Sequence, residues 1–217
     1  MLYLFPIGSL LSNNLPPIEQ LAFYQRASLF LRKHPFNDNP ISLDALSEAS
    51  ISKLFSLGTD PVIWRHARYP KTEPHQFKNY FDKVIARKDS LNFAVTYRPA
   101  SQLIGFTRLK SVDLRQSCAE TGTWLIPESQ NKGLNFYLKQ ILLAIAFEVL
   151  HLSYVYCYVS NSNLSSLKSL RRMGFDTITD NERVKTDHQH QEVYQQYLVF
   201  HCSNYDSHFR QRLSTLN

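Results

Sequence analysis

The sequence predicts a single mixed α/β domain, in which helices flank one central, mostly antiparallel sheet of six to seven strands. Between residues 91 and 126, apolar residues recur at every second position in three consecutive segments, which is typical of strands joined by short turns. After residue 127, helical and strand-like segments follow one another. Helices therefore come first, then a three-stranded meander, then a β–α–β–α–β–β series. This order is not that of a doubly wound sheet.

Length and composition indicate one folded domain. A chain of 217 residues fits one sizeable domain, and 43% hydrophobic with 13% aromatic residues can fill its core. Residues 1–27, where apolar stretches alternate with Asn and Pro pairs, are expected to form an N-terminal extension on a domain of residues 28–217. Because this extension is apolar, we expect it to pack on the domain or on a second copy, as in a homodimer.

Charge and cysteine usage exclude several classes of protein. The net charge of +6 suits an anionic ligand, but no cluster of five or six Lys or Arg marks a dedicated nucleic-acid-binding arm. The three cysteines are far apart, which predicts reduced thiols and no metal site. His188 and His190 are interpreted as part of a polar turn. The start of the chain has no basic stretch and is too short to span a membrane, so we expect a cytoplasmic protein.

In the first half, residues 28–33 or 41–43 are expected to supply the first strand. Apolar residues at helical spacing predict a helix over 46–57, a short turn-rich helix within 60–70 and an amphipathic helix over 72–85. The expected caps are Ser42 or Asp44 before the first helix, Gly58 after it, and Thr72 before the last.

In the second half, the periodicity is stronger. Strands are predicted at 91–97, 103–112, 118–126, 154–159 and 192–201, with a further strand from 175 onward. The segment 133–150 has few polar residues, which predicts a helix buried on most sides. A shorter helix is predicted over 163–173, where leucines recur at every third residue.

The loop from Gln130 to Asn135 leads from a strand into the buried helix and is the first candidate for ligand binding. The first N–H groups of a helix have no partner within it and lie at the positive end of its dipole. Such a terminus binds phosphate oxygens without basic side chains. Gly133 lets the backbone come close, and Lys132 adds charge. Taken alone, the same spacing also fits an ordinary turn before a helix.

A second segment gives this loop its context. The run from Asn163 to Phe175 begins a helix directly after a strand and ends in Gly-Phe. Together the two segments resemble the signatures of the GNAT superfamily of N-acyltransferases. Residues 61–70, 103–105 and 119–122 resemble the branch that contains the ribosomal-protein N-terminal acetyltransferases. The resemblance extends over roughly residues 40 to 200.

This resemblance implies a GNAT-like sheet that is splayed between its fourth and fifth strands, with acetyl-CoA or a related acyl-CoA in the gap. Backbone groups near Leu125 and Ile126 would pair with the pantetheine arm, and Asn163 would hydrogen-bond the cofactor arm or the acyl region. The implied cofactor-binding residues are Leu125, Ile126, Gln130, Asn131, Lys132, Gly133, Leu134, Asn135 and Asn163.

The catalytic candidates follow from the same resemblance. An amine must lose a proton before it attacks a thioester, and Glu120 matches the strand carboxylate that would accept this proton. The alternative for Glu120 is a surface or ion-paired carboxylate. Many members have a Tyr seven residues after the Asn, where this chain has Leu170, so Ser166 is the nearest hydroxyl for a general acid or is simply a helix residue. Asn163 completes the candidate catalytic set.

Trp64, Arg65 and Tyr69 are expected to wall the acceptor pocket, although Trp64 is also a natural core residue. The acceptor is then a protein N-terminus or a small amine, and the sequence does not choose between them. The alternative is a GNAT-fold protein without catalysis that binds CoA or a protein or RNA partner. A Glu120 that faces the gap favours the enzyme, and one that faces away favours the alternative.

Overall fold

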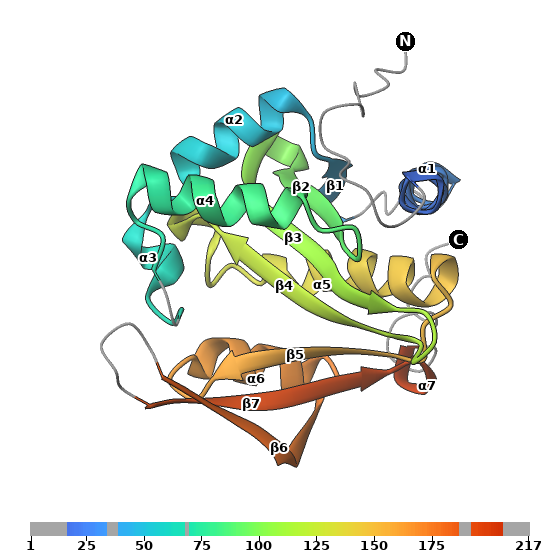
Figure 1. The fold of residues 1–217 in the computed structure, drawn as a ribbon, viewed down its shortest axis with the longest axis vertical. Helices are drawn as coiled ribbons and strands as arrows, with labels where there is room; N and C mark the ends of the chain where they lie inside the picture. Colours follow the sequence, from blue (N-terminus) through green and yellow to red (C-terminus); the bar gives the residue numbers. More distant parts are fainter. Residues whose placement is uncertain (1–16, 34–38, 68–69, 187–191, 206–217) are drawn as a thin grey trace.

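A seven-stranded sheet with the order β1-β2-β3-β4-β5-β7-β6 forms the centre of the computed structural model (Figure 1), which describes residues 17–33, 39–67, 70–186 and 192–205. The strands are β1 (Ile41–Ala45), β2 (Leu91–Tyr97), β3 (Gln102–Asp113), β4 (Cys118–Leu125), β5 (Tyr154–Ser160), β6 (Asp176–Thr186) and β7 (Glu192–His201). Strands β4 and β5 pair in parallel, and every other neighbouring pair is antiparallel. The predicted mixed sheet is therefore confirmed.

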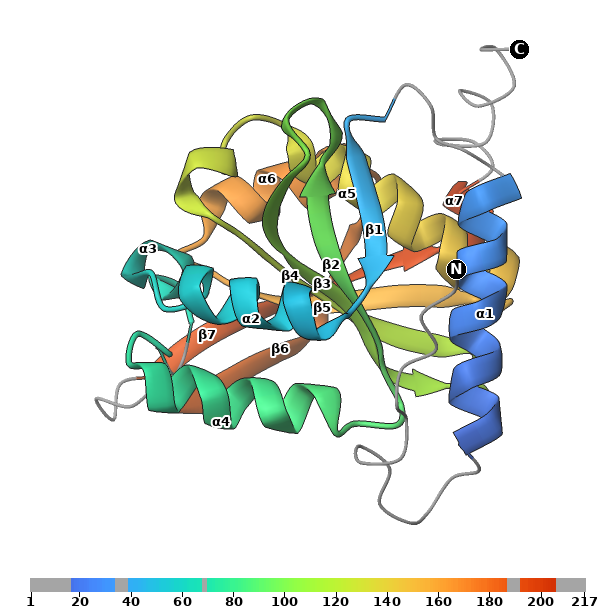
Figure 2. The ribbon, with the colours of Figure 1, turned by 90° about the horizontal axis from the view of Figure 1, so that it is seen from above.

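Helices cover both faces of the sheet (Figure 2). They are α1 (Pro17–Lys33), α2 (Glu48–Leu57), α3 (Pro61–Trp64), α4 (Pro74–Ile85), α5 (Leu134–Ala144), α6 (Leu164–Arg172) and α7 (Cys202–Tyr205), and α5 continues into a π-helical turn over Ile145–Val149. Short 3-10 turns follow β2 at Arg98–Ala100 and β4 at Pro127–Ser129.

The two faces have separate cores because side chains alternate along each strand. On one face, Phe106 of β3 and Trp124 of β4 pack with Phe77 and Phe81 of α4, and aromatic ring contacts link them. The larger core on the opposite face consists mainly of α5 and α6 packed on the sheet, with Leu138 completely buried. The sheet therefore presents different chemistry on its two faces.

Strands β4 and β5 pair over three residues and then separate. The last parallel pair joins Glu120 to Tyr156, and no pairing joins the later residues of β4 to those of β5 within the described chain. Figure 1 shows β1–β4 diverging from β5–β7 from this point. We call the region between Thr121–Leu125 and residues 157–160 the β4–β5 split. The predicted position of the splay is confirmed.

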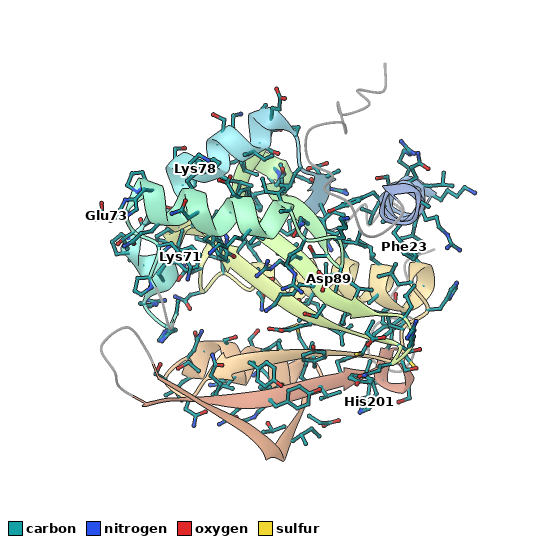
Figure 3. All side chains as sticks on the ribbon, viewed as in Figure 1. Phe23, Lys71, Glu73, Lys78, Asp89 and His201 are labelled. Carbon is teal, nitrogen blue, oxygen red and sulfur yellow. The ribbon has the colours of Figure 1, made fainter. Side chains whose placement is uncertain are left out.

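The first strand is Ile41–Ala45, so one of the two expected segments is correct, whereas residues 28–33 are helical. Helix α1 continues through the expected domain boundary after residue 27 and packs on the sheet. The Tyr24 hydroxyl accepts a hydrogen bond from the Asn92 backbone N–H at 2.6 Å, and Ala27 is fully buried. Burial raises the pKa of Tyr24 to about 12. Phe23 also packs against this core from α1 (Figure 3).

The residues expected to cap the N-termini of α2 and α4 were wrong. Ser42 and Asp44 lie in β1, where β2 pairs with them, and Ser47 caps α2 by accepting a hydrogen bond from the Ser50 N–H. Helix α4 begins after Glu73 rather than Thr72, because Pro74 occupies its first turn. Gly58 follows α2, as expected. The expected turn at His188 and His190 lies outside the described residues.

No helix of the described residues combines the length and the apolar character that crossing a bilayer requires.

Two strand glycines give a matched test of how tightly β3 and β4 pack. A Cβ at Gly105 would collide with the Trp124 carbonyl oxygen and lie 2.9 Å from the Leu125 Cα, whereas a Cβ at Gly122 would have its nearest neighbour at 3.6 Å. We expect Gly105→Ala to lower the free energy of unfolding by about 1–3 kcal/mol. Gly122→Ala should leave it unchanged or raise it by up to about 1 kcal/mol. Urea denaturation of both variants checks this, and equal effects would contradict the packing.

Candidate functional site

A cavity of about 890 Å³ occupies the β4–β5 split and the space between α3 and the sheet. Its walls come from α3, β3, β4, the loop before α5, β5 and α6. The described lining contains six Lys or Arg residues, while Glu120 is its one acidic residue. The cavity therefore combines unpaired strand edges, a helix N-terminus and an excess of positive charge.

The loop from Gln130 to Asn135 presents free backbone donors to this cavity. Gly133 has a φ of 74° and precedes α5, and Asn131 also lies in the left-handed region with a φ of 58°. Within the described chain, the N–H groups of 131–135 have no backbone carbonyl partner. A Cβ added at Gly133 would meet nothing within 4 Å, so the space in front of the loop is open. These features fit the pyrophosphate of CoA.

The side chain of Gln130 holds the loop to the strand rather than pointing to a ligand. Its Nε2 donates to the Leu125 carbonyl at 2.9 Å, and its Oε1 accepts from Arg65 Nη2 at 2.9 Å. Arg65 therefore contacts the loop of residues 130–135, and it also lines the cavity. On the other side, His66 Nδ1 lies 3.1 Å from the Ser162 hydroxyl, so the end of α3 touches both sides of the split.

The backbone of β4 offers fewer groups to the pantetheine arm than the sequence suggested. The Ile126 N–H donates to Ile104, and its carbonyl accepts from the Ser129 N–H, so both groups are used within the protein. Gln130 takes the Leu125 carbonyl. Because alternate residues of a strand direct their backbone groups to opposite edges, the remaining groups that face the split are those of Thr123 and the Leu125 N–H.

Asn163 begins α6 and acts as its N-cap. Its Oδ1 accepts hydrogen bonds from the Ser166 N–H and the Ser165 hydroxyl, each at 3.2 Å. Both Asn163 and Ser166 line the cavity, together with Leu170. Asn163 and Ser166, both predicted site residues, therefore lie at the split, but the Asn163 side-chain oxygen already accepts the hydrogen bonds that cap α6.

Glu120 is the last residue of β4 that pairs with β5, and it lines the cavity. Its Oε1 accepts from Lys110 Nζ at 2.6 Å across the β3–β4 pair, and the Glu120 side chain is 17% exposed. Burial lowers the pKa of Lys110, and the nearby Glu120 carboxylate opposes that shift. The ion pair fixes one oxygen of Glu120 and leaves the other without a partner among the described residues.

Lys139 is a functional candidate that the sequence analysis missed. It points from α5 into the split and is almost completely buried, and its Nζ donates to Thr121 at 2.6 Å and to Thr123 at 3.1 Å. The pKa of Lys139 is lowered to about 8 by burial. Burial also raises the pKa of the neighbouring Cys157 thiol to about 12, so that thiol stays protonated at neutral pH. In the sequence, the feature that could have identified this residue is a Lys within a largely apolar helical segment.

Trp64 lies both in a hydrophobic core and at the cavity. It belongs to the core beside Phe77, its indole N–H donates to the Gly58 carbonyl at 2.6 Å, and it also lines the cavity. Tyr69 lies outside the described residues. The described residues contain no group of three or more His, Cys, Asp or Glu that could hold a metal ion.

Comparison with known proteins identifies the fold and the family. A family model of the acetyltransferase (GNAT) domain matches residues 41–176, which is more than half of the chain. Among curated proteins, no sequence matches significantly. The spermidine N-acetyltransferase from Vibrio cholerae in complex with CoA and spermine superposes with a TM-score of 0.66 at 20% identity, covering 76% of this chain and 98% of that chain. A GCN5-related N-acetyltransferase from Brucella melitensis gives 0.67 at 17% identity, covering 81% of each.

These matches confirm the resemblance to the superfamily, but they give no support to the ribosomal-protein branch. The identities to solved structures are low, so those likenesses concern the fold. The description of the site depends on the geometry above.

Gly133 tests the pyrophosphate loop. We expect Gly133→Glu to abolish detectable binding of acetyl-CoA in calorimetry, because a carboxylate would occupy the space at the positive end of α5. Gly133→Gln has the same size without the charge and should retain more affinity. Both variants carry a strain of about 1–2 kcal/mol from a side chain at positive φ. Undiminished binding of acetyl-CoA by a folded Gly133→Glu protein would show that this loop does not bind the pyrophosphate.

Lys139 makes stability depend on pH. Its pKa falls from 10.5 unfolded to about 8 folded, so the unfolded chain binds more protons between these values and the free energy of unfolding rises there. Below this pH range, Lys139 is charged in both the folded and the unfolded state, so the folded state bears the full free-energy cost of burying the charge. We expect Lys139→Met to raise the free energy of unfolding by on the order of 1–3 kcal/mol near neutral pH. At alkaline pH, where Lys139 is neutral, the variant should lose this advantage over the wild type. The orphaned Thr121 and Thr123 hydroxyls reduce the gain.

Urea denaturation at neutral and alkaline pH measures this difference, with the exposed Lys168→Met on α6 as the control. A loss of stability at neutral pH in Lys139→Met would show that the hydroxyl contacts outweigh the burial of the charge.

Proposed function

The chain belongs to the GNAT acetyltransferase family and is an acetyl-CoA-dependent N-acetyltransferase; from this premise we propose that Glu120 accepts a proton from a primary amine held in the β4–β5 split. The observation that carries the proposal is the position of Glu120. It is the last residue of β4 that pairs with β5, and it is the one carboxylate in the described lining of the cavity.

Bound acetyl-CoA would supply an acyl carbon that is open to attack and a thiolate that can leave. The loop amides of 131–135 would hold its pyrophosphate, and Thr123 with the Leu125 N–H would hold its arm along β4. These groups direct the arm toward the closed end of the split, where Glu120 lies.

The ion pair with Lys110 positions the Glu120 carboxylate for this role. Lys110 holds one carboxylate oxygen at 2.6 Å and thereby orients the side chain, while the second oxygen stays available to the amine or to one intervening water. An amine that has lost its proton can attack the thioester. Ser166 and Lys139 also line the cavity and are the candidates for donating a proton to the departing thiolate.

The acceptor class is the finer part of the proposal. A protein N-terminus and a small amine both present the required primary amine, and a solved relative of similar fold has spermine bound. The alternative of a CoA-binding protein without catalysis is motivated by Leu170, which has no hydroxyl, and by the Glu120–Lys110 pair, which is also a common structural arrangement.

We expect Glu120→Gln to lower kcat by about 100-fold or more, because the neutral amide cannot accept the proton. Acetyl-CoA binding in calorimetry should remain, since Glu120 lies away from the pyrophosphate loop. Glu128→Gln, which removes an exposed carboxylate near that loop, is the matched control. Release of the CoA thiol in the presence of an amine measures the rate. Equal rates for the two variants would favour the alternative without a catalytic Glu120.

A further inference from the structure

We propose that the acceptor is a dipolar amine, in which an anionic group is held by Arg108 while the amine meets Glu120. This inference rests on the proposed function, because it takes Glu120 as the group that receives the amine. Its evidence is separate and lies in the charged and aromatic side chains of β3, β4 and the segment before α4.

Gly122 places two cations beside the split. Strands β3 and β4 pair Arg108 with Gly122 and Lys110 with Glu120. A Cβ added at Gly122 would lie 3.6 Å from Arg108 Nε and 4.0 Å from Lys110 Cε. Both side chains therefore extend across β4 over the position where Gly122 has no side chain. Arg108, Lys110, Gly122 and Glu120 all line the same cavity.

The charges on this wall do not balance. Glu120 pairs with Lys110, and no carboxylate among the described residues pairs with Arg108. Lys71 does not line this cavity, but it lies next to it beside α3 and α4, with its Nζ over the ring of Trp64 (Figure 3). Burial and, to a smaller extent, the nearby Arg108 charge together lower the pKa of Lys71 to about 8. An anion bound here would offset this repulsion between cations.

The aromatic faces of the wall are already occupied by the protein's own cations. Lys71 Nζ lies 4.7 Å from the ring centre of Trp64 and 5.2 Å from that of Tyr80. The Arg108 guanidinium lies 5.9 Å from the Tyr80 ring centre. A polyamine would need such faces or carboxylates for its additional ammonium groups. On this wall it would instead meet Arg108 and Lys110.

The spacing along the strand defines the acceptor further. Glu120 and Gly122 are two residues apart on one face of β4, which corresponds to about 7 Å. A carboxylate at Arg108 would thus lie roughly this far from an amine at Glu120. Free lysine has such a separation between its ε-amine and its carboxylate. A peptide N-terminus followed by an acidic residue has a similar one.

A second hollow of about 650 Å³ shares Tyr80 with the first and is lined by Lys71 and Lys83. It gives room for an acceptor longer than a free amino acid. The shared chemistry, an amine with a nearby carboxylate, therefore has two sources, a small amino acid and an acidic peptide. The experiment must separate them.

Matched acceptors test the proposal with the full chain and acetyl-CoA. Lysine differs from cadaverine by its carboxylate, and the peptide Ala-Asp-Glu differs from Ala-Ala-Ala amide by its negative charge. We expect kcat/KM to be about tenfold or more higher for the carboxylate-bearing member of each pair. A larger preference within the peptide pair identifies a peptide N-terminus, and one within the lysine pair identifies a small amine. Spermidine serves as the polycation.

Arg108→Gln should remove the preference by lowering kcat/KM for the carboxylate-bearing acceptor about tenfold or more, while changing little the kcat/KM of Ala-Ala-Ala amide and cadaverine, which have no carboxylate. Arg108→Lys should restore part of it. Arg115→Gln, at an exposed cation in the β3–β4 turn, should retain the wild-type preference.

The inference is overturned if spermidine or cadaverine is the better substrate, or if Arg108→Gln leaves the preference unchanged; the proposed function then survives. If no amine of any charge is acetylated although acetyl-CoA binds, the proposed function fails as well.

Discussion

The organisation of this site depends on the separation of β4 from β5 after only three paired residues. Two strand edges then face each other inside the domain, and their N–H and C=O groups need partners other than each other. The protein supplies one of these partners itself, because Gln130 takes the Leu125 carbonyl. Lys139 reaches the same region from α5, where it binds the side-chain hydroxyls of Thr121 and Thr123. The groups that remain are those that a ligand with amide and phosphate oxygens can satisfy. The same geometry therefore breaks the sheet and creates the binding site.

Maintaining the split costs stability. A buried ammonium at Lys139 has hydroxyl partners and no carboxylate partner among the described residues, and Asn131, which is not a glycine, has a positive φ. Such features persist only where the surrounding structure determines them strongly. Here the fully buried leucines and isoleucines of α5 and the ring contacts of α4 with Phe106 and Trp124 provide that support on the two faces of the sheet.

The sequence predicted what depends on local periodicity and missed what depends on pairing between distant segments. Strands β2 to β4, helices α5 and α6 and the loop before α5 follow from spacing that is visible within each segment. Ser42 and Asp44 looked like helix caps because their pairing with β2, some fifty residues later, leaves no local trace. Arg108 and Lys110 were missed for the same reason, since only the register with Gly122 and Glu120 brings them to the cavity.

The distribution of charge within the cavity suggests which molecule the cations Arg108 and Lys110 of β3 bind. A helix N-terminus binds phosphate through backbone N–H groups, so the loop from Asn131 to Asn135 can hold the pyrophosphate without Arg108 or Lys110. Lys168 and Arg172 of α6 add two further cations to the lining of the cavity. Arg108 and Lys110 lie on the face of the sheet opposite to α5, with Glu120 as their one described counter-charge. Without a bound anion, they would repel each other and any amine that still carries its proton. Such an arrangement is favourable when the arriving molecule brings its own negative charge, because the anion then balances Arg108 while the amine reaches Glu120.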